Sequence, residues 1–226
     1  MNQRLNALLS LIPDGCGVID VGTDHGCLPA ALAGREYPGA LFASDIRPGP
    51  LAAAERTARD AGLENRIRFL LADGLDGCEP EAVDTIVIAG MGGDTICGIL
   101  DRAEWCMDRR YTLVLQPMTR AEVLRYWLVN NEFAITHEDL VLDGGIVYSL
   151  FTARFGGVTR LNEAELYTGS CAMLRDHPLF PALLKREQRR FARMLKGIDG
   201  ASSPGELAGR RAVYAAILEQ LKEMEP

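Results

Sequence analysis

The sequence predicts an α/β protein in which a doubly wound, largely parallel sheet ends in an antiparallel hairpin and a small all-helical hairpin follows. Three observations predict this fold class. Short apolar runs alternate with helical patterns from residue 17 to residue 130, which is typical of strands covered on both faces. Two strand-like stretches then follow each other with no helix between them, and the remaining chain reads as helix. We expect two domains, residues 1–155 and 156–226.

Five apolar runs predict the parallel strands. They occupy residues 17–21, 41–44, 67–72, 83–89 and 113–115. Helices are expected to begin near Pro29, near Pro50 and around Asp94. A further helix is expected after the fifth run, where Thr119 and Glu122 have the spacing of a capping box. Because parallel strands joined by helices need right-handed crossovers, the helices should cover both faces of the sheet.

The antiparallel end of the sheet is predicted from residues 133–142 and 146–155, which are joined by Asp143-Gly144-Gly145. Two strand-like stretches joined by so short a glycine turn form a β-hairpin. A mainly parallel sheet that finishes in such a hairpin resembles the seven-stranded, Rossmann-like sheet of the class I S-adenosylmethionine (SAM) methyltransferases.

The C-terminal segment is predicted to form two antiparallel helices packed as a coiled hairpin. Leu184, Phe191 and Ile198 recur at seven-residue intervals in the first helix, and a similar apolar stripe runs through residues 207–221. The run Ser203-Pro204-Gly205-Glu206 supplies an N-cap, an N1 proline and an N3 glutamate for the second helix.

The composition, with 48% hydrophobic and 24% charged residues in 226, is ordinary for a soluble globular protein. The apolar stretch at residues 5–12 is too short to span a bilayer and meets Pro13 and Asp14 instead of a cleavage site. The six cysteines include no C-x-x-C pair, and with three histidines they have no metal-ligand spacing. We therefore expect a cytoplasmic protein with reduced thiols, no membrane segment and no metal.

The charge is unevenly distributed along the chain. Residues 1–155 carry 13 Lys and Arg against 22 Asp and Glu, a net charge of −9, whereas residues 156–226 carry 11 against 9, a net charge of +2. A basic run within the second part marks the place where a polyanion would bind, although such runs are often only solvated helix faces. Its residues are Lys185, Arg186, Arg189, Arg190, Arg193 and Lys196.

The turn after the first strand predicts a ligand pocket at the carboxyl end of the sheet. Asp20 ends the strand, and Gly22, Thr23 and His25 follow it before the next helix. The glycines have the spacing G-x-x-x-G, not the G-x-G-x-x-G spacing that brings a backbone against a pyrophosphate. A ligand without phosphates is therefore favoured. His25 is interpreted either as a ligand contact or as a simple hydrogen-bonding turn residue.

Two further carboxylates are expected at the same edge of the sheet. Asp45, followed by Ile46, ends the second strand, where a carboxylate accepts the ribose hydroxyls of an adenosine ligand. Asp73 and Gly74 follow the third strand, where an acceptor suits the exocyclic amine of an adenine. Together with Asp20, these carboxylates favour a cationic sulfonium ligand and disfavour the pyrophosphate of NAD.

The fourth strand leads into the glycine-rich run Gly90-Met91-Gly92-Gly93-Asp94. In this fold class the end of that strand lies where the transferred methyl group meets its acceptor, and glycines permit close approach of a flat base. Asp24 and Asp94 are both candidates for stabilising a cation that forms on the base. Asp94 is also a candidate N-cap of the following helix.

Five segments taken together resemble the bacterial tRNA adenine-22 N1-methyltransferase family, often called TrmK. They are residues 20–29 (DVGTDHGCLP), 49–51 (GPL), 73–75 (DGL), 87–93 (VIAGMGG) and 113–117 (LVLQP). Gly26-Cys27 departs from the Ala-Tyr that many relatives carry. The resemblance implies SAM as the methyl donor and N1 of an adenine in tRNA as the acceptor. With tRNA as the substrate, the basic run from Lys185 to Lys196 is where we expect its phosphate contacts.

Other functions remain open at this point. They are a SAM-dependent methyltransferase of a small molecule, a catalytically silent SAM-binding or RNA-binding protein and, least favoured by the glycine spacing, an NAD-dependent oxidoreductase. A requirement for intact tRNA and a steep loss of activity with salt would separate the first from a tRNA enzyme. Formation of a methylated product would exclude the second, the catalytically silent binding protein.

Overall fold

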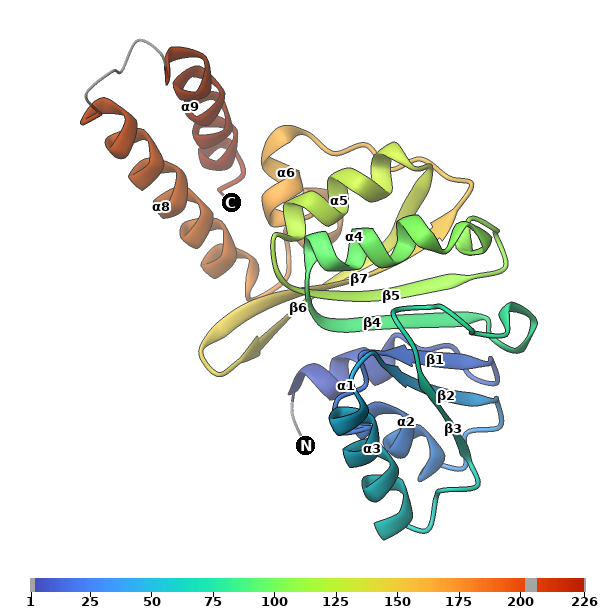
Figure 1. The fold of residues 1–226 in the computed structure, drawn as a ribbon. Helices are drawn as coiled ribbons and strands as arrows, with labels where there is room; N and C mark the ends of the chain where they lie inside the picture. Colours follow the sequence, from blue (N-terminus) through green and yellow to red (C-terminus); the bar gives the residue numbers. More distant parts are fainter. Residues whose placement is uncertain (1–2, 202–206, 226) are drawn as a thin grey trace.

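The protein, seen in a computed structural model, contains a seven-stranded sheet with the order β3-β2-β1-β4-β5-β7-β6 (Figure 1). The structure describes residues 3–201 and 207–225. Strands β1 to β5 pair in parallel, and β7 pairs antiparallel with both β5 and β6. The predicted α/β class, with its seven-stranded Rossmann-like sheet, is therefore confirmed. The strands are β1 (Val18–Val21), β2 (Leu41–Asp45), β3 (Ile67–Leu71), β4 (Thr85–Gly92), β5 (Thr112–Thr119), β6 (Phe133–Asp143) and β7 (Ile146–Phe155).

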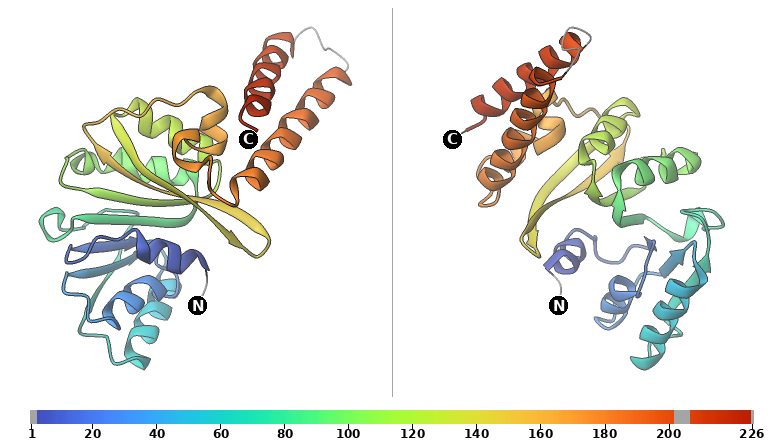
Figure 2. Two further views of the ribbon diagram at one scale, coloured as in Figure 1. Left: turned by 180° about the vertical axis from the view of Figure 1, so that it is seen from behind. Right: turned by 60° about the vertical axis from the view of Figure 1, so that its left-hand side comes forward.

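Helices cover both faces of the sheet (Figures 1 and 2). Neighbouring residues in the apolar strands point to opposite faces, so Val18 packs with one helix layer and Ile19 with the other. Strands buried on both faces have no need of polar alternation. One layer holds α1 (Gln3–Ser10), α2 (Cys27–Ala33) and α3 (Pro48–Asp60), and the other holds α4 (Gly93–Arg102) and α5 (Ala121–Asn130); short 3-10 helices cover Pro80–Ala82 and Glu104–Cys106.

The antiparallel hairpin has the predicted turn. Gly144 and Gly145 connect β6 to β7 with φ values of 55° and 79°. Positive φ at both central residues is the requirement of a type I′ turn, which glycine meets without strain.

Two predicted helix caps are wrong. Thr119 is the last residue of β5, because it pairs with Gly92 of β4, and α5 begins after Arg120 with no side-chain cap. The N-cap of α4 is Gly92, again with no side-chain cap hydrogen bond, so Asp94 lies one residue inside the helix. Glu122, the expected capping partner of Thr119, accepts a hydrogen bond from Arg190 instead.

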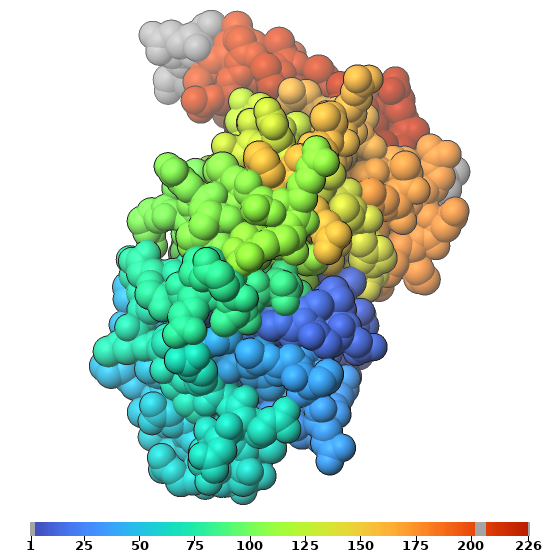
Figure 3. Space-filling model, turned by 90° about the vertical axis from the view of Figure 1, so that its right-hand side faces the viewer, coloured from blue at the N-terminus to red at the C-terminus, as the bar shows by residue number. Residues whose placement is uncertain are grey.

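The C-terminal helices form the predicted antiparallel hairpin, which lies beside the β6 end of the sheet (Figure 1). In the space-filling view the red residues of this hairpin lie at the top of the molecule (Figure 3). Phe191 packs edge-on against Tyr167 and Tyr214, with ring centroids 4.8 and 5.6 Å apart. Leu140 of β6 belongs to the same apolar cluster. A boundary after residue 155 therefore stays a proposal, because the helices share a core with the sheet. These helices are α6 (Glu163–Thr168), α7 (Cys171–Leu174), α8 (Phe180–Asp199) and α9 (Ala208–Glu223).

Part of the C-terminal prediction lies outside the described residues. The predicted N-cap run Ser203-Pro204-Gly205-Glu206 falls in the gap between residues 201 and 207. In the helix that follows, Ile217 and Leu221 are the buried apolar residues.

A buried ion pair joins the sheet to the C-terminal helices. Arg125 of α5 and Glu138 of β6 have side chains that are 0% and 1% exposed, and Nε of Arg125 donates to Glu138 at 2.8 Å. Arg125 Nη1 also donates to the Leu166 carbonyl of α6, and the other Glu138 oxygen accepts the Ser170 amide. The pair therefore fixes the segment from which α7 and α8 continue.

We expect Arg125→Met to lower the free energy of unfolding by about 3–5 kcal/mol, because it leaves the Glu138 carboxylate buried without a cation. The double variant Arg125→Met/Glu138→Leu should recover part of that loss. Urea unfolding measures both, with Arg59→Met on the exposed face of α3 as the control. A loss below about 1 kcal/mol for the single variant would show that the pair does not hold this region together.

Candidate functional site

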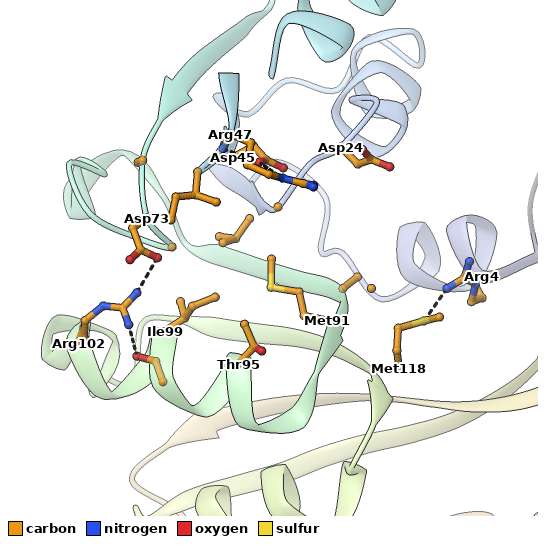
Figure 4. A pocket seen from close by; sticks show the side chains of 18 residues that line it. Arg4, Asp24, Asp45, Arg47, Asp73, Met91, Thr95, Ile99, Arg102 and Met118 are labelled. Atoms are coloured by element: carbon orange, nitrogen blue, oxygen red, sulfur yellow. Dashed lines mark hydrogen bonds and ion pairs between the residues drawn. The ribbon is translucent and has the colours of Figure 1, made fainter. Parts of the chain in front are cut away.

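A cleft of about 660 Å³ opens at the carboxyl ends of β1, β2, β3 and β4 (Figure 4). This is the edge where an open α/β sheet binds ligands, at the point where strand order reverses between β1 and β4. Eight of the residues predicted from the sequence line it: Gly22, Asp24, Asp45, Ile46, Asp73, Gly74, Gly90 and Met91. Five others lie elsewhere: Asp20, Thr23, His25, Gly92 and Asp94.

Asp20 and Thr23 are buried beside the cleft and do not line it. Both residues are 7% exposed, and the Thr23 hydroxyl donates to Asp20 at 2.7 Å. Burial raises the pKa of Asp20 from 3.8 to about 6; the Thr23 hydrogen bond opposes this rise and the Asp45 charge adds to it. In place of the strand-end cleft, Asp20 and Thr23 line a smaller cavity of about 160 Å³ beside it.

Asp45 presents a fixed carboxylate at the end of β2. The residue is 4% exposed, and its Oδ1 accepts the backbone amide of Arg47 at 2.8 Å. The Arg47 guanidinium lies 3.6 Å from the same oxygen, but its side chain is 69% exposed. The local turn therefore holds the Asp45 carboxylate in place.

Asp73 has a partner that the sequence analysis did not predict. Arg102, at the end of α4, donates to Asp73 Oδ1 at 2.8 Å, and both side chains line the cleft (Figure 4). Both side chains are about half exposed. No local pattern identifies this contact, because the two residues are 29 positions apart.

The glycines in and next to the cleft are required for different structural reasons. Gly22 has φ +72°, and a Cβ there would lie 2.1 Å from the methyl carbon of Met91. Gly90 has φ +79° with open space around it, and its amide donates to Gln116 Oε1 at 3.2 Å. Gly93 does not line the cleft; a Cβ there would lie 2.2 Å from the Arg120 carbonyl oxygen, so this glycine permits the contact between α4 and the β5–α5 junction.

The two candidate carboxylates for cation stabilisation lie in different places. Asp24 lines the cleft and is 63% exposed, with His25 Nε2 3.7 Å away. Asp94 pairs with Arg120 at 3.1 Å and does not line the cleft. The structure thus brings Asp24 to the cleft together with the glycine loop.

Two more lining residues come from distant elements. Arg4 of α1 donates to the sulfur of Met118, at the end of β5, at 2.9 Å (Figure 4). Arg4 also donates to Asp143 at 2.8 Å and lies over the Tyr148 ring, 5.0 Å from its centre. The first helix therefore closes the β5 side of the cleft through the β6–β7 hairpin.

Within residues 3–201 and 207–225, no three His, Cys, Asp or Glu side chains are grouped as metal ligands. No described helix is both long and apolar enough to cross a membrane.

Residues 1–151 match the family model described as a methyltransferase domain. The chain belongs to this methyltransferase family. It is 32% identical over 157 residues to the tRNA (adenine(22)-N(1))-methyltransferase of Bacillus subtilis, an alignment that covers 69% of this chain and 66% of that protein. The chain thus matches about two thirds of the length of that curated relative.

Solved structures match almost the whole methyltransferase. B. subtilis TrmK, an m1A22 tRNA methyltransferase, has a TM-score of 0.88 at 26% identity. The match covers 99% of this chain and 98% of that one. Sp1610 of Streptococcus pneumoniae, a proposed tRNA (m1A22) methyltransferase solved with SAM, has a TM-score of 0.84 at 27% identity, with 99% of each chain covered. The resemblance predicted from the five segments is confirmed.

The raised pKa of Asp20 predicts a pH-dependent stability. Between about pH 4 and 6 the folded protein holds a proton there that the unfolded chain releases, so this stabilisation is complete at low pH and is lost as the pH rises through 6. Asp20→Asn removes that dependence. The unfolding free energy of the variant minus that of wild type should therefore rise by about 1–1.5 kcal/mol when the pH is raised from about 5 to about 7.5. Urea unfolding at both pH values measures it, and a pH-independent difference would contradict the shift.

Proposed function

We propose that this protein transfers the methyl group of SAM to N1 of an adenine in tRNA, at adenine 22 as in the relatives it matches. The observation that carries the proposal is the cleft at the strand ends, where carboxylates for an adenosine donor face a glycine loop open to a flat base. Membership of the methyltransferase family supports the reaction class.

The donor half of the cleft fits SAM through its acceptors. Asp45 is buried and held by its own turn, so its carboxylate is ready to accept the ribose hydroxyls. Asp73 and Gly74 border the place for the adenine, and Ile46, 60% exposed, supplies an apolar surface beside it. Gly22 permits the close approach of the Met91 side chain and borders the place for the methionine part, with Asp20 and Thr23 buried beside it. The carboxylates complement the positive sulfonium and amino groups.

The acceptor half needs alignment and charge stabilisation. The bond from sulfur to the methyl carbon breaks while the bond from N1 to that carbon forms, and the positive charge moves from sulfur to the adenine ring. Gly90 and Met91 form the wall that a planar base approaches, with Gly92 following them outside the cleft, and the Asp24 carboxylate stabilises the charge as it develops. Asp94 is the weaker candidate, because Arg120 already neutralises it. N1 lies on the Watson-Crick edge, so the target adenine must be unpaired or flipped out.

We place the substrate RNA beside the C-terminal helices. We assign its phosphate contacts to the basic run of α8, which positions RNA without reading its sequence. The residues are Lys185, Arg186, Arg189, Arg190 and Arg193. Six free cysteines fit a cytoplasmic location.

The test is methylation of an unmodified tRNA transcript. The wild-type protein is incubated with SAM and the transcript, and the digested nucleosides are analysed by mass spectrometry. We expect N1-methyladenosine, its loss when adenine 22 is replaced by guanine, and a steep fall in rate with salt. Methyl transfer to a small molecule without RNA would replace the proposal, and binding of SAM and tRNA without any product would identify a silent adaptor.

We expect Asp45→Ala to weaken SAM binding by about 1.5–3 kcal/mol, because it removes charge-assisted hydrogen bonds to the ribose. Isothermal titration calorimetry measures the affinity. Asp60→Ala at the exposed far end of α3 is the matched control, since it removes the same charge away from the cleft. Equal affinity of Asp45→Ala and wild type would remove the ribose assignment.

We expect Asp24→Asn to lower the rate constant of methyl transfer about tenfold while SAM affinity stays within twofold, because the interaction strengthens only as positive charge develops on the base. Single-turnover rates at saturating tRNA measure it. Asp94→Asn is the matched comparison and should lose less, because it removes a charge already paired with Arg120. If neither variant slows the chemical step, alignment alone accounts for catalysis here.

A further inference from the structure

A second cleft, which we call the basic cleft, lies between the sheet and α8. It has a volume of about 370 Å³ and is bounded by the β5–α5 junction, by β7, by Tyr167 of α6 and by α8. Its principal lining side chains are Arg120, Tyr148, Tyr167, Arg186, Arg190 and Arg193. None of the roles assigned to the strand-end cleft uses it.

The basic cleft carries an excess of positive charge in an acidic protein. Four arginines and two glutamates line it, whereas the whole chain has a net charge of −7. Arg190 bridges Glu122 and Glu187 at 3.1 and 3.2 Å, and Arg186 pairs with the same Glu187 at 2.9 Å. Both acids are thus already engaged with other arginines, which leaves the charge of Arg193 for a ligand.

Arg193 is placed to offer that charge. Its side chain is exposed on α8, and its recorded hydrogen bond is a 3.3 Å contact from Nε to the Arg189 carbonyl one turn earlier. Arg186, Arg190 and Arg193 lie at helical spacing on the face of α8 that lines the cleft, and Lys185 and Arg189 do not line it. The structure therefore divides the basic run into two faces.

The basic cleft adjoins the strand-end cleft. Met118 lines both. Arg4, which lines the strand-end cleft, contacts Met118 and also lies over the ring of Tyr148, which lines the basic cleft. A wall of Met118, Arg4 and Tyr148 thus separates the place proposed for the target base from a groove of arginine and tyrosine. Cationic grooves with aromatic side chains are typical of sites for single-stranded nucleic acid.

We propose that the basic cleft holds the RNA backbone immediately next to the target adenine, with the flanking phosphate on Arg193. This rests on the proposed function, because the strand-end cleft must hold that adenine. A base that leaves the stack remains attached to the phosphates on either side of it. Because only the wall of Met118, Arg4 and Tyr148 separates the two clefts, the basic cleft receives one of these flanking phosphates. Glu122 and Glu187 keep Arg190 and Arg186 in place, and Arg193 makes the contact.

The test is a double-mutant cycle between Arg193 and the RNA. Transfer RNA is ligated from two synthetic halves with a neutral methylphosphonate at the 5′ or the 3′ phosphate of adenine 22, and Kd is measured by filter binding in low salt. On unmodified tRNA we expect Arg193→Gln to raise Kd about three- to tenfold. The slope of log Kd against log salt should fall by about 1, which is the value for one lost phosphate contact. With methylphosphonate at one of the two positions, Arg193→Gln and wild type should bind alike.

The controls separate this inference from the proposed function. Arg59→Gln on α3 removes the same charge from an exposed site on the other helix layer and should leave Kd within twofold. Equal SAM affinity shows that Arg193→Gln is folded. Two results would overturn the role of the basic cleft. One is that the affinity losses from Arg193→Gln and from the methylphosphonate add up at both phosphate positions, and the other is a Kd for Arg193→Gln equal to that of Arg59→Gln. Because Kd needs no turnover, a wild-type protein that binds tRNA but forms no N1-methyladenosine would overturn the proposed function alone.

Discussion

The buried ion pair between Arg125 and Glu138 is the interaction on which the position of the C-terminal helices, and with it the basic cleft, depends. It links α5 and β6 to the carbonyl of Leu166 and the amide of Ser170, where the chain turns toward α8. An isolated charge at this depth is costly, so both partners must stay together. By fixing the start of the C-terminal helices, the pair sets where α8 lies relative to β7, and this spacing creates the basic cleft.

The strand-end cleft depends on a different constraint, the topology of the parallel sheet. Crossovers of one hand bring the carboxyl ends of β1 to β4 to one edge, so residues far apart in sequence meet there. Asp45 is rigid and buried, whereas Asp73 and Asp24 are half exposed or more. Such a division suits a reaction in which the donor must be held in place while the base and its developing charge come from the solvent side.

Most of the fold follows from local patterns, because apolar runs and glycine turns act within a few residues. The capping box at Thr119 failed for a nonlocal reason: pairing with Gly92 extends β5 through that residue. Arg102 and Arg4 escaped prediction because their partners lie 29 to 139 positions away. The basic run was visible in the sequence, but its division into two faces depends on the packing of α8 against β7 and α6.

Hydrogen exchange followed by mass spectrometry tests most directly the claim that donor and RNA occupy adjoining clefts. S-adenosylhomocysteine should protect peptides that contain the strand ends and leave α8 unchanged. Addition of tRNA should then protect the β5–α5 junction, the start of β7 and the part of α8 around Arg193. Protection by S-adenosylhomocysteine away from β1, β2 and β4, or protection by tRNA confined to α9, would contradict the account.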